Sequence, residues 1–311
     1  MTIRVLKPGF FTTVQDFGRY GYTHLGVSPA GAADRMSLRI ANRLVDNDQN
    51  TPALEVTLLG ATLKFEEDAI IAVTGAACEC KLGSHDVPGA TAVEVPAGAV
   101  LSCGSMSSGA RSYLAIQGGI DVPRIMGSAS THVGACFGGL SGRRLRSGDL
   151  LPIGVRSKSS KSKVRSLRPG ALDRMQSYSP LRVTRGAQQE WFGPQSFATL
   201  FSSAYVMTEQ SDRAGLRLSG ATLRPREQSQ LLTDGIPLGA IQVPHDGQPI
   251  ILFVDQQTTG GYPKIANVIA ADMHRVGQLR PRDEVRFVEV SMAEAIDALR
   301  EQERWLEEIF A

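Results

Sequence analysis

Short apolar or alternating runs of residues, separated by turn residues, recur along the whole chain. The clearest runs are 53–59, 69–74, 111–117, 182–185, 240–243, 249–254 and 284–290. They are rich in β-branched residues and are bounded by Gly, Pro or Asp, a pattern typical of the strands of barrels and sandwiches. The pattern therefore predicts a mainly β protein with a few short helices.

The C-terminal segment has a helical period instead. Ser291 and Glu294 have the spacing of a capping box, in which both side chains bind free amide groups at the start of a helix. Apolar side chains follow at helical spacing, at Ile296, Leu299, Leu306 and Ile309. We expect a C-terminal helix whose apolar stripe packs on the core.

The two halves of the chain are related by an internal repeat. Three blocks recur at an offset of 178 to 180 positions: 34–40 and 212–218, 59–61 and 238–240, 70–73 and 250–253. A nearly constant offset indicates a duplicated β-rich domain. The copies have diverged locally, since 33–45 has helical spacing whereas Gly215 and Gly220 favour turns and strands.

A basic stretch separates the two halves. Residues 155–170 hold six Lys or Arg and no acidic residue. Such a stretch buries too little apolar surface to offset its ordering entropy, so it is a linker or a long surface loop, with a basic docking strip as the alternative. We predict a first domain at 1–155, a basic linker at 156–178, and a second domain with the C-terminal helix at 179–311.

Composition and charge exclude several classes of protein. Lys and Arg number 33 against 31 Asp and Glu, so the chain lacks the basic field of a protein that coats nucleic acid. The apolar runs reach about five residues, whereas a membrane-spanning helix needs about 20. We expect no nucleic-acid partner, no membrane association and a cytoplasmic location. In that compartment the four cysteines are expected to be reduced and mostly buried.

The densest candidate for chemistry is the segment 255–264, which follows an apolar strand. Lys264 offers a positive charge for a carboxylate or phosphate, or a base if burial lowers its pKa. Gly260 and Gly261 permit positive φ and close approach of backbone amides to a ligand. Asp255 can accept hydrogen bonds from an amide or amine. The alternative interpretation is a hairpin turn whose polar residues satisfy one another.

Two other positions are open to a structural or a functional interpretation. Gln242 reaches the same mouth as Asp255 if their strands form a hairpin, and a buried Gln is expected to bond either protein or ligand. Asp34 precedes a helical segment and is suited to cap it. The chain has no complete nucleophile elbow, phosphate-binding loop or dinucleotide motif, and its five histidines lack metal-ligand spacing, so we expect no metal site.

Several longer motifs carry a family resemblance. They include TTVQDFGRYG at 12–21, YLAIQGGIDVP at 113–123, GSAST at 127–131, QVP at 242–244 and TTGGYPK at 258–264. Together they resemble the KipA family, which comprises the C subunits of 5-oxoprolinase and proteins similar to the second subunit of allophanate hydrolase. This family is related to the carboxyltransferase domain of urea carboxylase. The resemblance runs from Thr12 to about Val290.

The resemblance implies both a fold and a function. The implied fold is two tandem cyclophilin-like β-barrel domains, in agreement with the repeat. The implied function is an ATP-dependent 5-oxoprolinase that opens the lactam of pyroglutamate to L-glutamate, acting with a KipI-like subunit and with a LamB/YcsF-like subunit. ATP is used by that complex, and its binding site is not assigned to this chain. The implied site residues are catalytic Lys264 and Asp255 and substrate-binding Asp34, Arg213, Gln242, Gly260, Gly261 and Tyr262.

Two alternatives stay open. In the urea carboxylase relatives the equivalent region transfers a carboxyl group from carboxybiotin to urea or another amide. This chain has no Met-Lys-Met biotin-acceptor motif, so biotin would have to come from a separate carrier. The second alternative is a non-catalytic regulator that binds a KipI-like partner. One departure from the family pattern is Arg282, which replaces the Gly usual in its turn.

Overall fold

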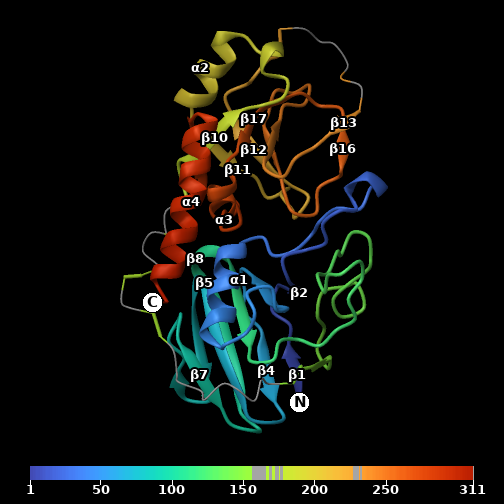
Figure 1. Cartoon of the computed structure of the whole chain (residues 1–311), viewed down its shortest axis with the longest axis vertical. Helices are drawn as coiled ribbons and strands as arrows, with labels where there is room; N and C mark the ends of the chain where they lie inside the picture. Colours follow the sequence, from blue (N-terminus) through green and yellow to red (C-terminus); the bar gives the residue numbers. More distant parts are fainter. Residues whose placement is uncertain are drawn as a thin grey trace. The chain divides into compact units, whose positions relative to one another are not determined.

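The structure is a computed structural model that describes residues 1–155, 166–167, 170–171, 175, 178–226, 231 and 233–310. These residues form two compact units, Met1–Arg19 with Ala30–Ala171 and Tyr20–Pro29 with Leu172–Ala311 (Figure 1). The predicted mainly β fold class is confirmed. Most of the basic linker predicted at 156–178 lies outside the described residues, so the predicted domain boundaries stay a prediction.

A curved nine-stranded sheet forms most of the first unit. Its strands are β1 (Thr2–Lys7), β2 (Phe11–Gln15), β3 (Ala53–Thr57), β4 (Thr62–Phe65), β5 (Ala69–Leu82), β6 (His85–Asp86), β7 (Ala92–Val95), β8 (Val100–Ile116) and β9 (Leu150–Pro152). The order is β2-β3-β8-β4-β1-β9, with β5 pairing β6, β7 and β8. Because β5 follows nearly all of β8 while β3 and β4 share its other edge, the sheet bends into a half-barrel.

Helix α1 (Arg35–Leu44) packs against β5 and β8. Its apolar side chains recur at helical spacing, and Leu38, Ile40 and Leu44 are buried at 2% exposure or less. The helix begins at Asp34, whose side chain accepts the amide hydrogen of Ser37 at 2.9 Å, so the expected cap is present. In the second half the equivalent block forms strand β12 (Gly215–Gly220), which agrees with the expected divergence of the copies.

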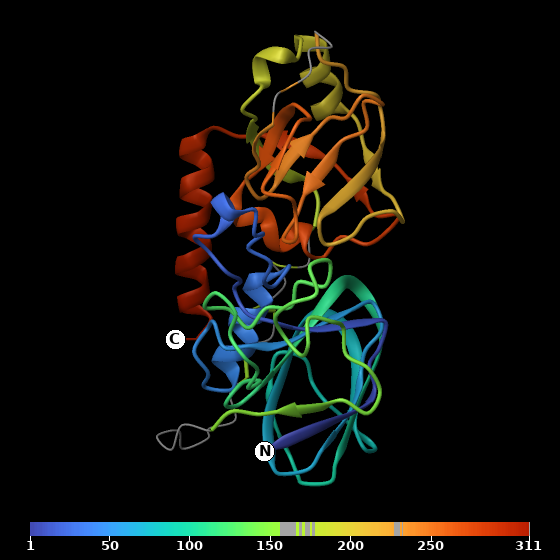
Figure 2. The same ribbon diagram turned by 90° about the vertical axis from the view of Figure 1, so that its right-hand side faces the viewer.

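The second unit contains an eight-stranded sheet (Figure 2). Besides β12 its strands are β10 (Leu181–Arg185), β11 (Tyr205–Met207), β14 (Ala240–Gln242), β15 (Ile250–Leu252), β17 (Lys264–Val268), β18 (Glu284–Val285) and β19 (Phe287–Glu289). The order is β18-β11-β12-β15-β14-β17-β10-β19. The two edge strands are consecutive in sequence and separated by Arg286 alone. The sheet must therefore curl until its edges meet, which gives a nearly closed barrel.

Smaller elements complete the second unit. Strands β13 (Asp234–Gly235) and β16 (Thr259–Gly260) form a separate two-stranded sheet. The short helices are α2 (Pro194–Ser202), α3 (Met273–Val276), η1 (Thr23–Leu25), η3 (Gln189–Trp191) and η4 (Ala270–Asp272). The segment Tyr20–Pro29 belongs to this unit, and Ser28 Oγ donates to the carbonyl of Val254 at 2.9 Å.

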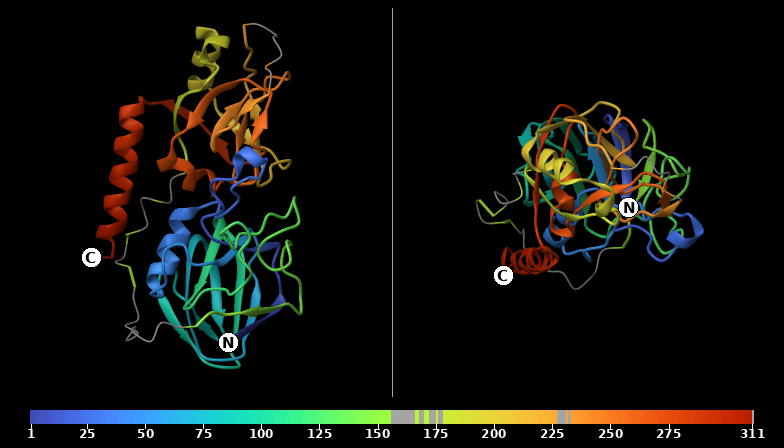
Figure 3. Two further views of the ribbon diagram at one scale, coloured as in Figure 1. Left: turned by 45° about the vertical axis from the view of Figure 1, so that its right-hand side comes forward. Right: turned by 90° about the horizontal axis from the view of Figure 1, so that it is seen from above.

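The C-terminal helix α4 (Met292–Glu308) starts as the sequence predicts (Figure 3). Ser291 Oγ accepts the Glu294 amide hydrogen at 3.2 Å, and Glu294 Oε2 accepts the Ser291 amide hydrogen at 2.7 Å. Both halves of the capping box are therefore present. Among the described residues, no helix has the length and apolar character needed to cross a membrane.

The expected burial of the α4 stripe is wrong for two of its members. Ile296 and Leu299 are 45% and 38% exposed, and only Ala298 and Leu306 are buried on this helix. The helix contacts η4 and β10, so only a narrow strip of its surface is covered. The helical spacing of apolar residues therefore predicted where the helix lies, but it did not predict how many of its side chains are buried.

The cysteines also depart from expectation. Cys80 and Cys103 are register partners on β5 and β8, with Cα atoms 4.1 Å apart, and form a disulfide. Cys78 and Cys136 are free, and Cys136 is exposed. The expectation of four reduced, mostly buried cysteines is therefore wrong, because strand pairing brings together two cysteines that are 23 positions apart in sequence.

Candidate functional site

Lys264 lies at the start of β17, between β14 and β10 in the barrel of the second unit. Its side chain is only 2% exposed, and Nζ donates to Asp234 Oδ2 at 2.7 Å. A buried ammonium requires such a counter-charge, because desolvation of an unpaired charge is very costly. The motif that sequence analysis selected thus places its lysine inside the barrel wall, paired to a carboxylate on β13.

Asp234 and Gln188 were not identified by sequence analysis, yet both bind Lys264. Gln188 Nε2 donates to Asp234 Oδ2 at 3.2 Å, and Gln188 Oε1 accepts the Lys264 amide hydrogen at 3.1 Å. Asp234 Oδ1 accepts the Gly235 amide hydrogen at 2.7 Å. The Lys264 hydrogen bond, aided by these donors, lowers the pKa of Asp234. The only sequence signal was indirect, since a buried lysine needs a carboxylate.

Gln242 and Tyr262 lie next to Lys264. Gln242 is the register partner of Lys264 in the β14–β17 ladder, and its Nε2 donates to the Tyr262 carbonyl at 3.3 Å. Tyr262 is 40% exposed, and its ring meets that of His245 edge to face, with ring centroids 5.9 Å apart. The cluster therefore combines a buried cation, a buried amide and a solvent-facing aromatic ring.

Gly260 joins this cluster through the β13–β16 ladder, in which it faces Asp234. A Cβ at this position would lie 2.5 Å from Gln257 Nε2 and 2.7 Å from Ile236 Cδ1. Neither Gly260 nor Gly261 has a left-handed φ. The positive φ that glycine permits is therefore not used at either position, and a Cβ at position 260 would make the ends of the Gln257 and Ile236 side chains shift.

Asp255 and Arg213 form a separate ion pair. Arg213 Nε and Nη2 donate to the two Asp255 carboxylate oxygens at 2.8 and 3.2 Å, and the Asp255 amide hydrogen binds the Arg213 carbonyl. Both side chains are 9% exposed. A bidentate pair fixes both carboxylate oxygens. The two residues predicted as catalytic thus have different partners, Asp234 for Lys264 and Arg213 for Asp255.

Asp34 lies in the first unit within a buried polar network. Besides capping α1, it accepts the Ser37 hydroxyl at 2.6 Å, and its amide donates to the Tyr113 hydroxyl at 2.7 Å. Tyr113 in turn donates to Glu55 Oε2 at 2.6 Å. Burial, together with the nearby carboxylates, raises the pKa of Tyr113 well above its usual value. These bonds support α1, and the substrate-binding role of Asp34 stays a prediction.

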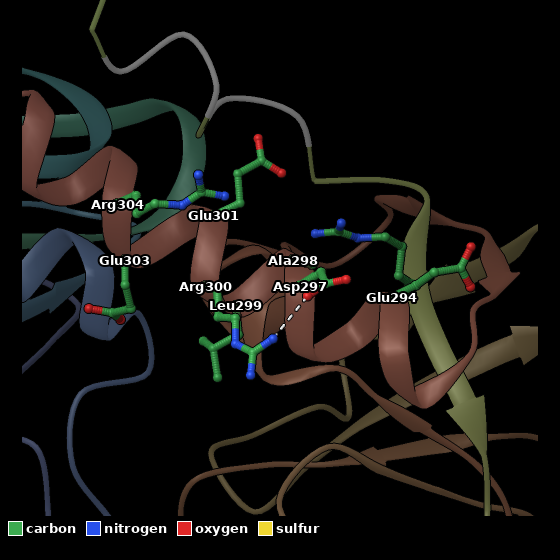
Figure 4. Close-up of a pocket in the computed structure, with 9 residues that line it drawn as sticks. Glu294, Asp297, Ala298, Leu299, Arg300, Glu301, Glu303 and Arg304 are labelled. Carbon is green, nitrogen blue, oxygen red and sulfur yellow. Dashed lines mark hydrogen bonds and ion pairs between the residues drawn. The ribbon is translucent and has the colours of Figure 1, made fainter.

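A groove of ≈ 940 Å³ follows the exposed side of α4 (Figure 4). Its lining is dominated by charged side chains of both signs, and Arg300 is paired with Asp297 at 3.2 Å. None of the site residues predicted from sequence lines it. Within the part of the chain that the structure describes, no cluster of His, Cys, Asp and Glu has the geometry to hold a metal ion.

Comparisons with known proteins place the chain in a family. Two curated relatives, each named as the C subunit of 5-oxoprolinase, match it over nearly their whole length. The protein from Escherichia coli is 42% identical over 99% of this chain and 97% of the relative. The protein from Haemophilus influenzae is 37% identical over 96% and 94%.

A solved structure of urea carboxylase from Kluyveromyces lactis matches with a TM-score of 0.91 and 33% identity. The match covers 99% of this chain but only 29% of that larger one. Residues 25–289 match the family described as carboxyltransferase domain, subdomain A and B. The resemblance noted in the sequence is thereby confirmed, and the chain belongs to this carboxyltransferase-domain family.

Proposed function

We propose that this chain is the C subunit of an ATP-dependent 5-oxoprolinase, acting in the cytoplasm with a KipI-like subunit and with a LamB/YcsF-like subunit. The observation that carries the proposal is the similarity, over 97% and 94% of their lengths, to two proteins named as C subunits of 5-oxoprolinase. The buried lysine cluster supports the proposal, because a fixed cation can stabilise the anionic oxygen that forms when a lactam opens.

The reaction opens a lactam, which is a resonance-stabilised amide. Water adds to the carbonyl carbon, the C–N bond breaks, and the nitrogen takes up a proton to give L-glutamate. The carbonyl oxygen becomes anionic during the addition, and a fixed cation stabilises that charge. Lys264 is the cation proposed for this role, and backbone amides at Gly260 and Gly261 are the proposed additional donors. ATP hydrolysis by the complex drives the opening.

The test is ATP-dependent release of glutamate from 5-oxoproline by the three reconstituted subunits, with and without this chain. We expect activity only when the chain is present. Lys264→Met should lower turnover by at least about 100-fold, as loss of an oxyanion-stabilising group does. Lys81→Met is the matched control, because Lys81 is exposed on β5 of the other unit. Full activity without the chain, or with Lys264→Met, contradicts the proposal.

A biotin-dependent carboxyltransferase is the second candidate. The close fit to the urea carboxylase structure supports it. In that case turnover of urea or another amide would require bicarbonate and a separate biotinylated carrier. If neither reaction occurs while a KipI-like partner still binds tightly, the non-catalytic regulator becomes the better proposal.

A further inference from the structure

We propose that Asp234 is a positioning residue that, together with Gln188, keeps the buried Lys264 side chain charged and fixes the place of its Nζ atom. The inference deepens the proposed function, because a lysine that stabilises an oxyanion must remain an ammonium. The positioning itself is a property of this chain and is measurable without turnover.

The first argument is the asymmetry of the ion pair. The Lys264 side chain is 2% exposed, whereas that of Asp234 is 48% exposed. Water can solvate the carboxylate but not the ammonium, so the pair serves chiefly to compensate the buried lysine. Removal of the carboxylate would leave the buried ammonium without this counter-charge, which is costly.

The second argument is that Gln188 forms hydrogen bonds with both Asp234 and Lys264. The side-chain Nε2 of Gln188 donates to Asp234, and its Oε1 accepts the backbone amide hydrogen of Lys264. The backbone amide of Gln188 also donates to the Lys264 carbonyl at 3.3 Å. The chain reaches this position because Gly186 lies against β17, where a Cβ would be 2.2 Å from the Lys264 carbonyl oxygen. Gln188 therefore holds both partners of the ion pair at once.

The third argument is the placement of Asp234 on β13. In the β13–β16 ladder Asp234 faces Gly260, which belongs to the predicted substrate-binding segment. A ligand that displaces this ladder would therefore move the counter-ion of Lys264 at the same time.

Among the residues that the structure describes, Asp234 is the charged side chain that pairs with Lys264. On β14 the neighbouring side chain is the neutral Gln242, and before η3 it is the neutral Gln188. The titratable side chains of Tyr262 and His245 meet edge to face. On β10 Arg185 is paired with Glu289. Asp234 is the carboxylate that bonds Nζ directly, and that bond in turn lowers the pKa of Asp234.

The experiment measures the titration of Lys264 by NMR of the full chain labelled at lysine ¹³Cε. The chain has seven lysines, and Lys264→Arg identifies the signal. Loss of an opposite charge at this distance should lower the titration midpoint of Lys264 by about one to three pH units in Asp234→Asn. Asp234→Glu retains the charge and should restore the midpoint to within about half a unit of wild type.

Asp246→Asn is the matched control. Asp246 also precedes a glycine in a turn and accepts a backbone amide hydrogen, from Gln248 at 3.0 Å, but it does not contact Lys264. We expect no shift in this variant. An unchanged Lys264 midpoint in Asp234→Asn, or equal shifts in Asp234→Asn and Asp246→Asn, would overturn the proposal.

Activity of the reconstituted complex separates this inference from the proposed function. If Lys264 acts as a cation, the alkaline limb of kcat/KM in Asp234→Asn should move to lower pH by the same amount as the NMR midpoint. A shifted midpoint in a complex that lacks 5-oxoprolinase activity even as wild type supports the positioning role and refutes the proposed function. An unshifted Lys264 midpoint in an active complex refutes the positioning role and supports the proposed function.

Discussion

Replacing Asp255 by Asn separates a structural role from the predicted catalytic one. The substitution keeps the size of the side chain but removes the charge that faces Arg213, in a pair whose members are both 9% exposed. Breaking a buried ion pair by removing one partner costs about 3–5 kcal/mol. Both carboxylate oxygens bind the guanidinium here, so we expect a loss near the lower end, about 3 kcal/mol, because the Asn oxygen still accepts one bond.

The assay is calorimetric or denaturant unfolding of the full chain. For a unit of about 150 residues, a loss of 3 kcal/mol lowers the Tm by roughly 6–12 °C. Arg213→Met combined with Asp255→Asn should recover at least about 1 kcal/mol of that loss, because the guanidinium that lost its carboxylate is then removed as well. A loss below about 1 kcal/mol in Asp255→Asn would refute the reasoning. If turnover then falls while stability is kept, Asp255 is catalytic as the sequence analysis predicted.

Three further outcomes are expected. Gly186→Ala should destabilise the chain by about 1–3 kcal/mol and disturb Lys264, because the new Cβ would meet the Lys264 backbone carbonyl. Gly235→Ala is the control, because a Cβ there meets no atom within 4 Å. Equal losses of unfolding free energy in the two variants would contradict this reasoning. Arg282→Gly should raise stability by about 1 kcal/mol, since Arg282 has φ = 78°, and an unchanged Tm would argue against strain there. Burial raises the pKa of Tyr205 to about 12, so stability should fall as pH rises above about 10. Ultraviolet titration of Tyr205→Phe should lack the tyrosinate signal that has its midpoint near 12.

Features that depend on neighbouring residues were predictable from the sequence. The capping box at Ser291 needs only two side chains three positions apart, and the cap at Asp34 needs only the helix that follows it. The family resemblance implied a Gly at position 282, and the backbone there is left-handed, with Arg282 at φ = 78°. In each case the physical cause lies within one turn of the chain.

Features that depend on strand register were not predictable. The ion-pair partner of Lys264 is Asp234, which lies on β13 in the separate two-stranded β13–β16 sheet. The β5–β8 pair contains register shifts on both sides of Cys78, so no spacing rule identifies Cys103 as the partner of Cys80. A single sequence shows the local pattern of a strand, but it does not show the register in which that strand pairs with its neighbour.

The closure of the second barrel has a consequence for synthesis of the chain. Its edge strands β18 and β19 lie at 284–289 and leave the ribosome after every other strand of that sheet. Until then β11 and β10 each present an open edge, and open edges invite pairing with other chains. A nascent chain stalled before residue 284 would carry both edges at once. Synthesis of residues 284–289 therefore covers the open edges of β11 and β10 and lowers the tendency of the intermediate to aggregate.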